Sequence, residues 1–191
     1  MKLDILVFGA HPDDIELSCA GTILKHIKLG LKVGVIDFTK GELGTRGTEE
    51  SRSGETKNAN KILGLELREN MGFKDGFFVN DEDHKLKLIK KIRQYKPNIV
   101  ITNAPSDRHP DHGRASDLTI DACFLSGLEK IETGQEKWRP NHLYHYIQFN
   151  NILPDFVVDI TEEMDGKIES IICYKTQFYN PDSTETETII S

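Results

Sequence analysis

The sequence predicts an α/β fold, a three-layer sandwich in which helices cover both faces of a mostly parallel sheet. Two observations support this prediction. Short runs of apolar, β-forming residues alternate with longer segments whose apolar residues recur at helical spacing. The first strand, helix and second strand, within Leu3–Phe38, together have the length expected of a right-handed parallel crossover. Continued alternation of this kind places helices on both faces of one sheet.

The first unit sets the pattern for the rest of the chain. Leu3–Gly9 is expected to form the first strand, and a turn at His11–Asp14 follows it. Ile15–Leu29 carries leucine and isoleucine at helical spacing, and Gly30 is a suitable helix stop. Lys32–Phe38 is expected to be the second strand.

The later elements repeat this alternation without an internal repeat or a long linker, so a single domain over residues 1–191 is expected. In chain order we expect a loop over Thr39–Glu50, a helix over Ser51–Leu63, a weak strand over Leu65–Asn70, a helix over Asp83–Tyr95, a strand over Asn98–Thr102, a polar loop over Asn103–Arg114, a helix over Ala115–Leu128, strands over His142–Phe149 and Phe156–Ile160, and a last helix over Thr161–Tyr174.

Composition limits the possible partners and the compartment. The formal net charge of −7 makes the chain a poor binder of nucleic acid or anionic membranes, since both need clustered Lys and Arg. The three cysteines are odd in number and widely spaced, which is typical of free thiols in a reducing compartment. The N-terminus resembles no signal peptide, and no run approaches ~18 apolar residues. We therefore expect a cytoplasmic protein whose partners are neither nucleic acid nor membrane.

Two polar loops carry residue types that bind metals. His11-Pro12-Asp13-Asp14 follows the first expected strand, and His109-Pro110-Asp111-His112 follows Asn98–Thr102. Both loops lie at carboxyl ends of strands, where sites form in parallel α/β sheets. Either motif alone is also typical of a helix cap or a polar loop. Two of them at the same edge of the sheet favour a functional site.

The donor types in these loops indicate one metal centre. An imidazole and a carboxylate three residues apart can converge on one ion, and this donor set suits a divalent metal such as zinc. We therefore expect His11, Asp14 and His112 to hold one Zn²⁺ with an open position for water. Such an ion lowers the pKa of its water from about 15.7 to about 7.

Three further residues of the motifs are candidates for catalysis. Asp13 is the candidate general base for the attacking water. His109, oriented by Asp111, is the candidate group that stabilises an oxyanion or protonates a leaving amine. The residues thus predict metal-assisted hydrolysis.

Longer segments around the two motifs resemble a known family. FGAHPDDIELSCAGT and PSDRHPDHGRA are similar to the paired motifs of the LmbE-like, or PIG-L, zinc N-deacetylases. TKGELGTRGT, KDGFF and YKTQFY are most similar to the bacillithiol biosynthesis deacetylases, which remove acetate from N-acetylglucosaminyl malate. The resemblance runs from about Lys2 to the C-terminus. It implies a Rossmann-like sandwich and zinc-dependent deacetylation of a small N-acetylated amino sugar conjugate, most closely N-acetylglucosaminyl malate.

The resemblance also implies roles for residues outside the two motifs. Arg52 in EESRSGE and Arg139 in KWRP resemble family arginines near the substrate and the oxyanion. Glu42 and Arg46, in the Gly-rich loop, are candidates to bind sugar hydroxyls or malate carboxylates, because Arg suits bidentate carboxylate binding. For each arginine, an ordinary solvated charge is the alternative interpretation.

The resemblance extends to assembly and chain length. It implies a homo-oligomer, a hexamer or a trimer. Members of the subgroup continue for several tens of residues beyond the equivalent of Thr188–Ser191. We therefore expect this sequence to lack the family's C-terminal segment.

Three other functions are compatible with parts of the pattern. A nucleotide-binding or dehydrogenase-like domain would need GxGxxG after the first strand, where this sequence has GAHPDD. A non-catalytic metal- or sugar-binding protein would not need Asp13 beside the expected ligands. A deacetylase acting on another N-acetylglucosaminide keeps the chemistry and changes only the substrate.

Overall fold

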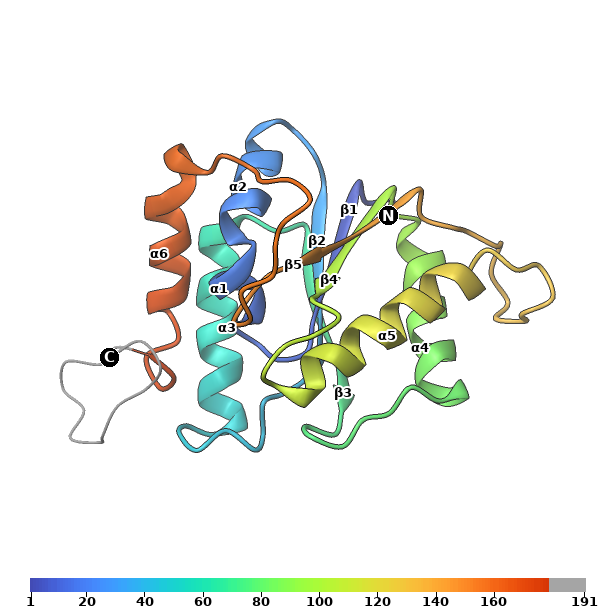
Figure 1. Cartoon of the computed structure of the whole chain (residues 1–191), viewed down its shortest axis with the longest axis horizontal. Helices are drawn as coiled ribbons and strands as arrows, with labels where there is room; N and C mark the ends of the chain where they lie inside the picture. Colours follow the sequence, from blue (N-terminus) through green and yellow to red (C-terminus); the bar gives the residue numbers. More distant parts are fainter. Residues whose placement is uncertain (179–191) are drawn as a thin grey trace.

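The computed structural model describes residues 1–178, which form a parallel sheet with helices on both faces (Figure 1). In this part of the chain the sheet has five strands in the order β3-β2-β1-β4-β5, and every neighbouring pair is parallel. The α/β prediction is therefore confirmed. The strands are β1 (Ile5–Gly9), β2 (Val33–Thr39), β3 (Leu67–Phe73), β4 (Ile99–Asn103) and β5 (His142–Tyr146).

The helices divide between the two faces because side chains alternate along each strand. From β1, Leu6 and Phe8 pack into the core cluster that includes residues of α4 and α5. Ile5 and Val7 face the opposite way, into the cluster that includes residues of α1 and α2. Figure 1 shows α1, α2, α3 and α6 on one side of the sheet, and α4 and α5 on the other. The helices are α1 (Asp14–Ser18), α2 (Ala20–Lys28), α3 (Glu49–Leu63), α4 (Glu82–Tyr95), α5 (Pro110–Leu125) and α6 (Met164–Ile172), the last preceded by a 3₁₀ turn, η1 (Thr161–Glu163).

The expected single helix over Ile15–Leu29 is wrong, because the structure divides it into α1 and α2. Cys19, with φ −119° and ψ 10°, leaves the helical region and caps both helices. The bend brings Gly21 against the Ile160 side chain, where a Cβ on residue 21 would lie 2.5 Å from Ile160 Cδ1. Close packing of the chain at Gly21 therefore accompanies the break.

Other elements also differ from expectation. α5 begins at Pro110 rather than Ala115, since proline suits the first turn of a helix. The HPDH motif is therefore the start of a helix and not part of a loop. Phe156–Ile160 forms no strand; Val157 is 81% exposed, and the Phe156 ring packs edge-on against Tyr144. The apolar composition of this segment had suggested a buried strand, but the segment does not pair with the sheet.

Some sequence-based expectations fall outside this description. Thr188–Ser191, which motivated the expectation of a missing C-terminal segment, lies beyond the described residues. Within residues 1–178, no helix combines the length and apolar character needed to span a membrane.

Candidate metal centre and active site

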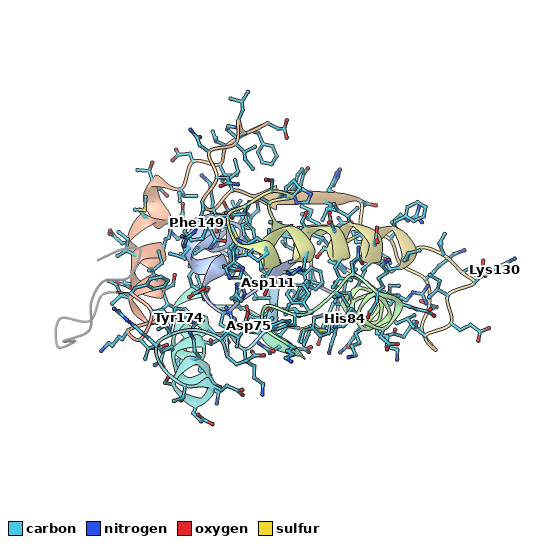
Figure 2. All side chains as sticks on the ribbon, turned by 60° about the horizontal axis from the view of Figure 1, so that its bottom comes forward. Asp75, His84, Asp111, Lys130, Phe149 and Tyr174 are labelled. Carbon is cyan, nitrogen blue, oxygen red and sulfur yellow. The ribbon has the colours of Figure 1, made fainter. Side chains whose placement is uncertain are left out.

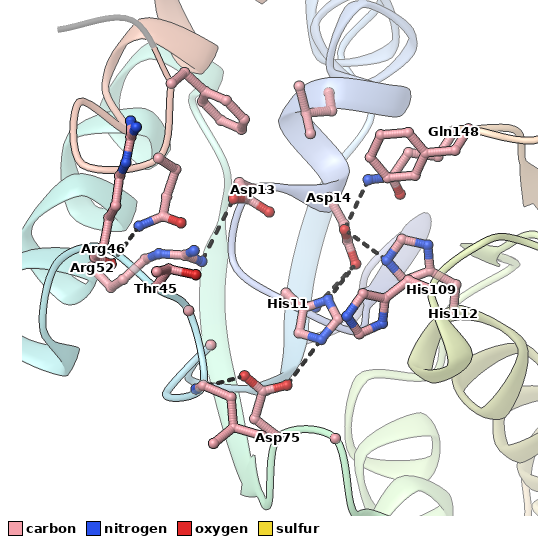
Figure 3. Close-up of a pocket in the computed structure, with 18 of the residues that line it drawn as sticks. His11, Asp13, Asp14, Thr45, Arg46, Arg52, Asp75, His109, His112 and Gln148 are labelled. Carbon is pink, nitrogen blue, oxygen red and sulfur yellow. Dashed lines mark hydrogen bonds and ion pairs between the residues drawn. The ribbon is translucent and has the colours of Figure 1, made fainter. Parts of the chain in front are cut away.

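The site lies where the winding of the sheet reverses. The chain proceeds from β1 to β2 and β3 on one side, whereas β4 and β5 extend the sheet on the other. The carboxyl ends of β1 and β4 flank this switch point, where α/β sheets open a crevice for ligands. The HPDD turn leaves β1, and the HPDH motif opens α5 after β4. The structure thus brings the two predicted motifs together (Figure 3).

Asp14 is the shared neighbour of the two predicted imidazole ligands. Its Oδ2 lies 3.5 Å from His11 Nδ1, and its Oδ1 lies 3.1 Å from His112 Nε2. The Asp14 side chain is only 3% exposed. Gln148 Nε2 donates to Asp14 Oδ1 at 2.9 Å, and Asn103 Nδ2 donates to Oδ2 at 3.2 Å. The three predicted ligands therefore form one buried cluster.

The other nitrogen of each imidazole faces a carboxylate. His11 Nε2 lies 3.1 Å from Asp75 Oδ1 and 3.3 Å from Asp111 Oδ2. His112 Nδ1 lies 2.9 Å from Asp107 Oδ2. Metal-binding histidines characteristically donate their second ring N–H to such a carboxylate.

Electrostatics in this cluster favour positive charge beside Asp14. Burial opposes the charge of His11, but its hydrogen bonds to Asp111, Asp14 and Asp75 hold its pKa well above the usual value. Burial also opposes the charge of His112, and there the carboxylate of Asp14 raises the pKa. The pKa of Asp14 is held well below its usual value, since the charge of His112 and hydrogen bonds from both imidazoles outweigh its burial.

The residues present fit a divalent cation. Two imidazoles and one carboxylate are a donor set that suits zinc and similar borderline ions. Donor atoms of the described residues also converge within 4.8 Å in two other groups, His11–His109–His112 and His11–Asp75–Asp111. The second group uses the His11 nitrogen that points away from Asp14. The first takes His109 in place of Asp14.

Asp13 lies beside the cluster and is held in a strained backbone conformation. Its φ is 113°, in the left-handed region that non-glycine residues seldom adopt. Arg52 Nη1 lies 3.5 Å from Asp13 Oδ2 and donates to the Pro12 carbonyl at 2.9 Å. Burial raises the pKa of Asp13 to about 7, although the charge of Arg52 opposes the rise. Asp13 is thus a largely buried carboxyl group beside the cluster, and the charge of Arg52 stabilises its ionised form.

His109 is the N-cap residue of α5. Its Nδ1 accepts a 3.3 Å hydrogen bond from the Asp111 backbone N–H, and its ring lies 4.6 Å from that of His11. Burial and the charge of His11 lower the pKa of His109. The Asp111 carboxylate accepts hydrogen bonds from His11, the Gly76 N–H and Arg114. Asp111 therefore contacts His109 through its backbone N–H, whereas its carboxylate contacts His11.

A cavity of ≈ 510 Å³ opens over the cluster and is large enough for a sugar conjugate. Asp75 and Asp111 lie close together near the middle of the molecule in Figure 2, below Phe149. Arg46 and Arg52, two of the four expected substrate-binding residues, line the cavity. The other lining residues come from both motifs, the Gly-rich loop, the β3–α4 turn, the segment after β5 and the chain after α6: His11, Asp13, Asp14, Leu17, Gly41, Leu43, Gly44, Thr45, Asp75, Gly76, Arg108, His109, His112, Gln148, Phe149, Gln177 and Phe178.

Two expected substrate-binding residues are placed differently. Glu42 is exposed and does not line the cavity; its Oε1 accepts from the Asp75 N–H at 2.8 Å and its Oε2 from the Lys40 N–H at 3.3 Å. Arg139 lies at the far end of α5: it donates to the Phe124 carbonyl at 2.8 Å and covers the Phe124 ring. Twelve residues of helix separate Phe124 from His112, or roughly 18 Å. The structure therefore does not bring Arg139 to the site.

Several polar residues of the site were not predicted from the sequence. Asp75 lies in the KDGFF segment, which contributes to the family resemblance but suggested no role for this residue. Asp107 and Arg108 directly precede the HPDH motif. Their place next to the motif could have indicated that they lie at the site. Gln148 follows β5 and carries no motif; only the parallel pairing of β5 with β4 brings it to Asp14.

Comparisons with known proteins agree with this geometry. The family described as "PIG-L: GlcNAc-PI de-N-acetylase" matches residues 6–123. A diacetylchitobiose deacetylase of Thermococcus kodakarensis is 27% identical over 91% of this chain and 70% of its own length. A probable N-acetyl-α-D-glucosaminyl L-malate deacetylase 2 of Bacillus anthracis is 28% identical over 91% of this chain and 81% of its own. The crystal structure of the conserved protein TT1542 from Thermus thermophilus superposes with a TM-score of 0.89 at 39% identity, covering 92% of this chain and 80% of that one.

Proposed function

Because this chain belongs to the PIG-L family of de-N-acetylases, we propose that it is a zinc-dependent hydrolase that removes the acetyl group from an N-acetylglucosaminyl conjugate. His11, Asp14 and His112 hold the ion in this proposal. The observation that carries it is the Asp14 carboxylate in contact with both imidazoles, 3.5 and 3.1 Å away, with Asp13 beside it. When bound there, a divalent ion supplies Lewis acidity, which acidifies water and polarises a carbonyl.

Two residues of the chain carry out the proton transfers and oxyanion stabilisation of amide hydrolysis. Asp13 takes a proton as water adds to the acetamide carbon. His109 stabilises the oxyanion that forms on the former carbonyl oxygen. The C–N bond breaks, the amine nitrogen receives the proton from Asp13 or His109, and acetate and the free amino sugar leave.

The substrate proposed is N-acetylglucosaminyl malate. The Bacillus anthracis relative named for this substrate supports the proposal, as do the basic side chains around the cavity. Arg46 and Arg108 line it, and Arg108 lies over the Phe149 ring at 4.3 Å. Guanidinium groups bind carboxylates in bidentate fashion. They are therefore suited to the two carboxylates of a malate aglycone.

Release of free amine from N-acetylglucosaminyl malate, with zinc analysis of the same protein, tests this function. We expect zinc-loaded wild-type protein to release amine and acetate in equal amounts. Asp13→Asn should keep its zinc and lose about 10²–10⁴-fold in kcat. Asp165→Asn, at an exposed carboxylate of α6, is the matched control and should behave like wild type. Full activity of Asp13→Asn would contradict the assigned general base.

Two alternatives give different results in the same assay. A deacetylase for another N-acetylglucosaminide, such as the diacetylchitobiose of the Thermococcus relative, would show higher kcat/KM for that substrate than for the malate conjugate. Arg46→Gln and Arg108→Gln would then fail to discriminate between charged and uncharged aglycones. A non-catalytic metal- or sugar-binding protein would bind zinc and release no amine from any conjugate.

A further inference from the structure

Each imidazole ligand of the proposed zinc site is held from behind by a carboxylate whose own position is fixed. An ionised carboxylate can only accept hydrogen bonds, so the ring nitrogen that faces it must carry the proton. For His11 this nitrogen is Nε2, which faces Asp75 at 3.1 Å; for His112 it is Nδ1, which faces Asp107 at 2.9 Å. With a cation bound at the nitrogens that face Asp14, the two histidines would therefore be held in opposite tautomers. Each presents its other nitrogen to Asp14.

Backbone N–H groups anchor these carboxylates. Leu43 N–H donates to Asp75 Oδ2 at 3.0 Å, and Arg108 N–H donates to Asp107 Oδ1 at 2.6 Å. The Asp75 side chain is 7% exposed and that of Asp107 is 1% exposed. Neither carboxylate is free to swing away into solvent. The two rings therefore have a defined orientation before any ligand binds.

The loop that carries Asp75 is itself held in two directions. Glu42 accepts from the Asp75 N–H at 2.8 Å, and the next residue, Gly76, donates its N–H to Asp111 Oδ2 at 2.8 Å. Asp111 is the second acceptor for His11 Nε2. The β3–α4 turn thus joins the Gly-rich loop to the back of His11. The carboxylate of Glu42, expected to bind sugar, instead accepts from the backbone N–H groups of Asp75 and Lys40.

We propose that Asp75 and Asp107 are positioning residues that fix the orientation and tautomer of His11 and His112 as zinc ligands, a role that rests on the function proposed above. Carboxylates of this kind set ring orientation and raise the basicity of the ligating nitrogen, and their loss typically weakens metal binding 10–100-fold. Asp75 and Asp107 act through the histidines, and their contribution is measurable without any substrate.

Zinc affinity measured by competition with a chromophoric chelator tests the proposal. Asp75→Asn and Asp107→Asn should each weaken zinc binding by about 10–100-fold. The matched control is Glu49→Gln, since this exposed carboxylate pairs with Lys40 outside the cluster and should leave the affinity unchanged. Zinc affinities within threefold of wild type for both Asp variants would overturn the proposal. So would a raised KM with unchanged zinc affinity in Asp75→Asn, because that result indicates a substrate contact.

Two further measurements keep the result interpretable. The variant His11→Ala separates the two proposals. If this variant binds zinc as tightly as wild type, the proposed metal site is wrong. If it loses zinc while both Asp variants keep zinc, only the positioning role is wrong. Nitrogen-15 NMR of the wild-type histidines needs no variant to fold. It should show the proton on Nε2 of His11 and on Nδ1 of His112 in the zinc-loaded protein, and the reverse assignment for either ring would overturn the proposal.

Discussion

Replacing Arg68 with methionine should strongly destabilise the fold, because Arg68 pairs with two buried carboxylates next to the active site. Arg68 joins β3 to α1, the helix that begins with Asp14. Its Nε and Nη2 donate to the two oxygens of Asp37 at 2.8 and 3.0 Å, and Nη1 donates to Glu16. Tyr174, after α6, donates to the same Glu16 at 3.2 Å. Arg68, Asp37 and Glu16 are no more than 4% exposed at their side chains.

The magnitude follows from the charges left behind. Without Arg68, two carboxylates remain buried without their cation, and breaking a buried ion pair in this way costs about 3–5 kcal/mol. For a domain of this size that corresponds to a fall of roughly 6–20 °C in Tm. Lys40→Met breaks the exposed pair with Glu49 and should leave the stability unchanged within error.

The loss should also depend on pH. Burial already raises the pKa of Asp37 above its usual value, against the opposing charge of Arg68. A raised folded-state pKa means that the stabilising contribution is present at low pH and is lost as the pH rises through that pKa. Removing Arg68 raises the pKa of Asp37 further, so the variant should lose more stability at pH 8 than at pH 5.

Urea unfolding, followed by circular dichroism and the fluorescence of Trp138, measures these differences in unfolding free energy. The triple variant Glu16→Gln, Asp37→Asn, Arg68→Met removes the stranded charges and should recover part of the loss. A loss under about 1 kcal/mol in Arg68→Met, or an equal loss at both pH values, would refute the reasoning.

Three other outcomes are expected. His109→Ala should lower kcat by about 10²–10³-fold and leave bound zinc at the wild-type level; loss of zinc together with activity would mean that His109 is a ligand. Gly21→Ala should destabilise the fold by about 1–3 kcal/mol in urea unfolding, because its new Cβ would lie 2.5 Å from Ile160 Cδ1. The control is Gly54→Ala, which should be neutral or stabilising because nothing lies within 4 Å of the added Cβ. Arg139→Ala should leave kcat/KM unchanged, because the structure keeps this side chain at the far end of α5; a clear loss would show that it reaches the substrate.

The sequence was most informative for the candidate site residues that directly follow a strand. The HPDD and HPDH motifs each follow a strand, and β1 and β4 are neighbours in a parallel sheet, so their convergence could be predicted from chain order and strand direction. The same reasoning led to Asp13 as the candidate general base, because its place in the motif keeps it beside Asp14 without requiring it as a ligand.

Residues brought to the site by tertiary packing were harder to predict. Gln148 reaches Asp14 only because β5 pairs with β4 in one register, and no local pattern in its segment encodes that pairing. Asp75 reaches the site because the β3–α4 turn places its carboxylate 3.1 Å from His11, which follows β1. Phe156–Ile160 shows the converse error: an apolar run was assigned to a strand, although composition cannot tell an exposed apolar segment from a buried one.

The position of the metal ion tests the central claim most directly. Anomalous diffraction from crystals of the zinc-loaded protein should place one ion about 2.0–2.2 Å from donor atoms of His11, Asp14 and His112. A peak bound by His11, Asp75 and Asp111, or by the three histidines without Asp14, would contradict the account, because either would assign the ion to a different set of donors.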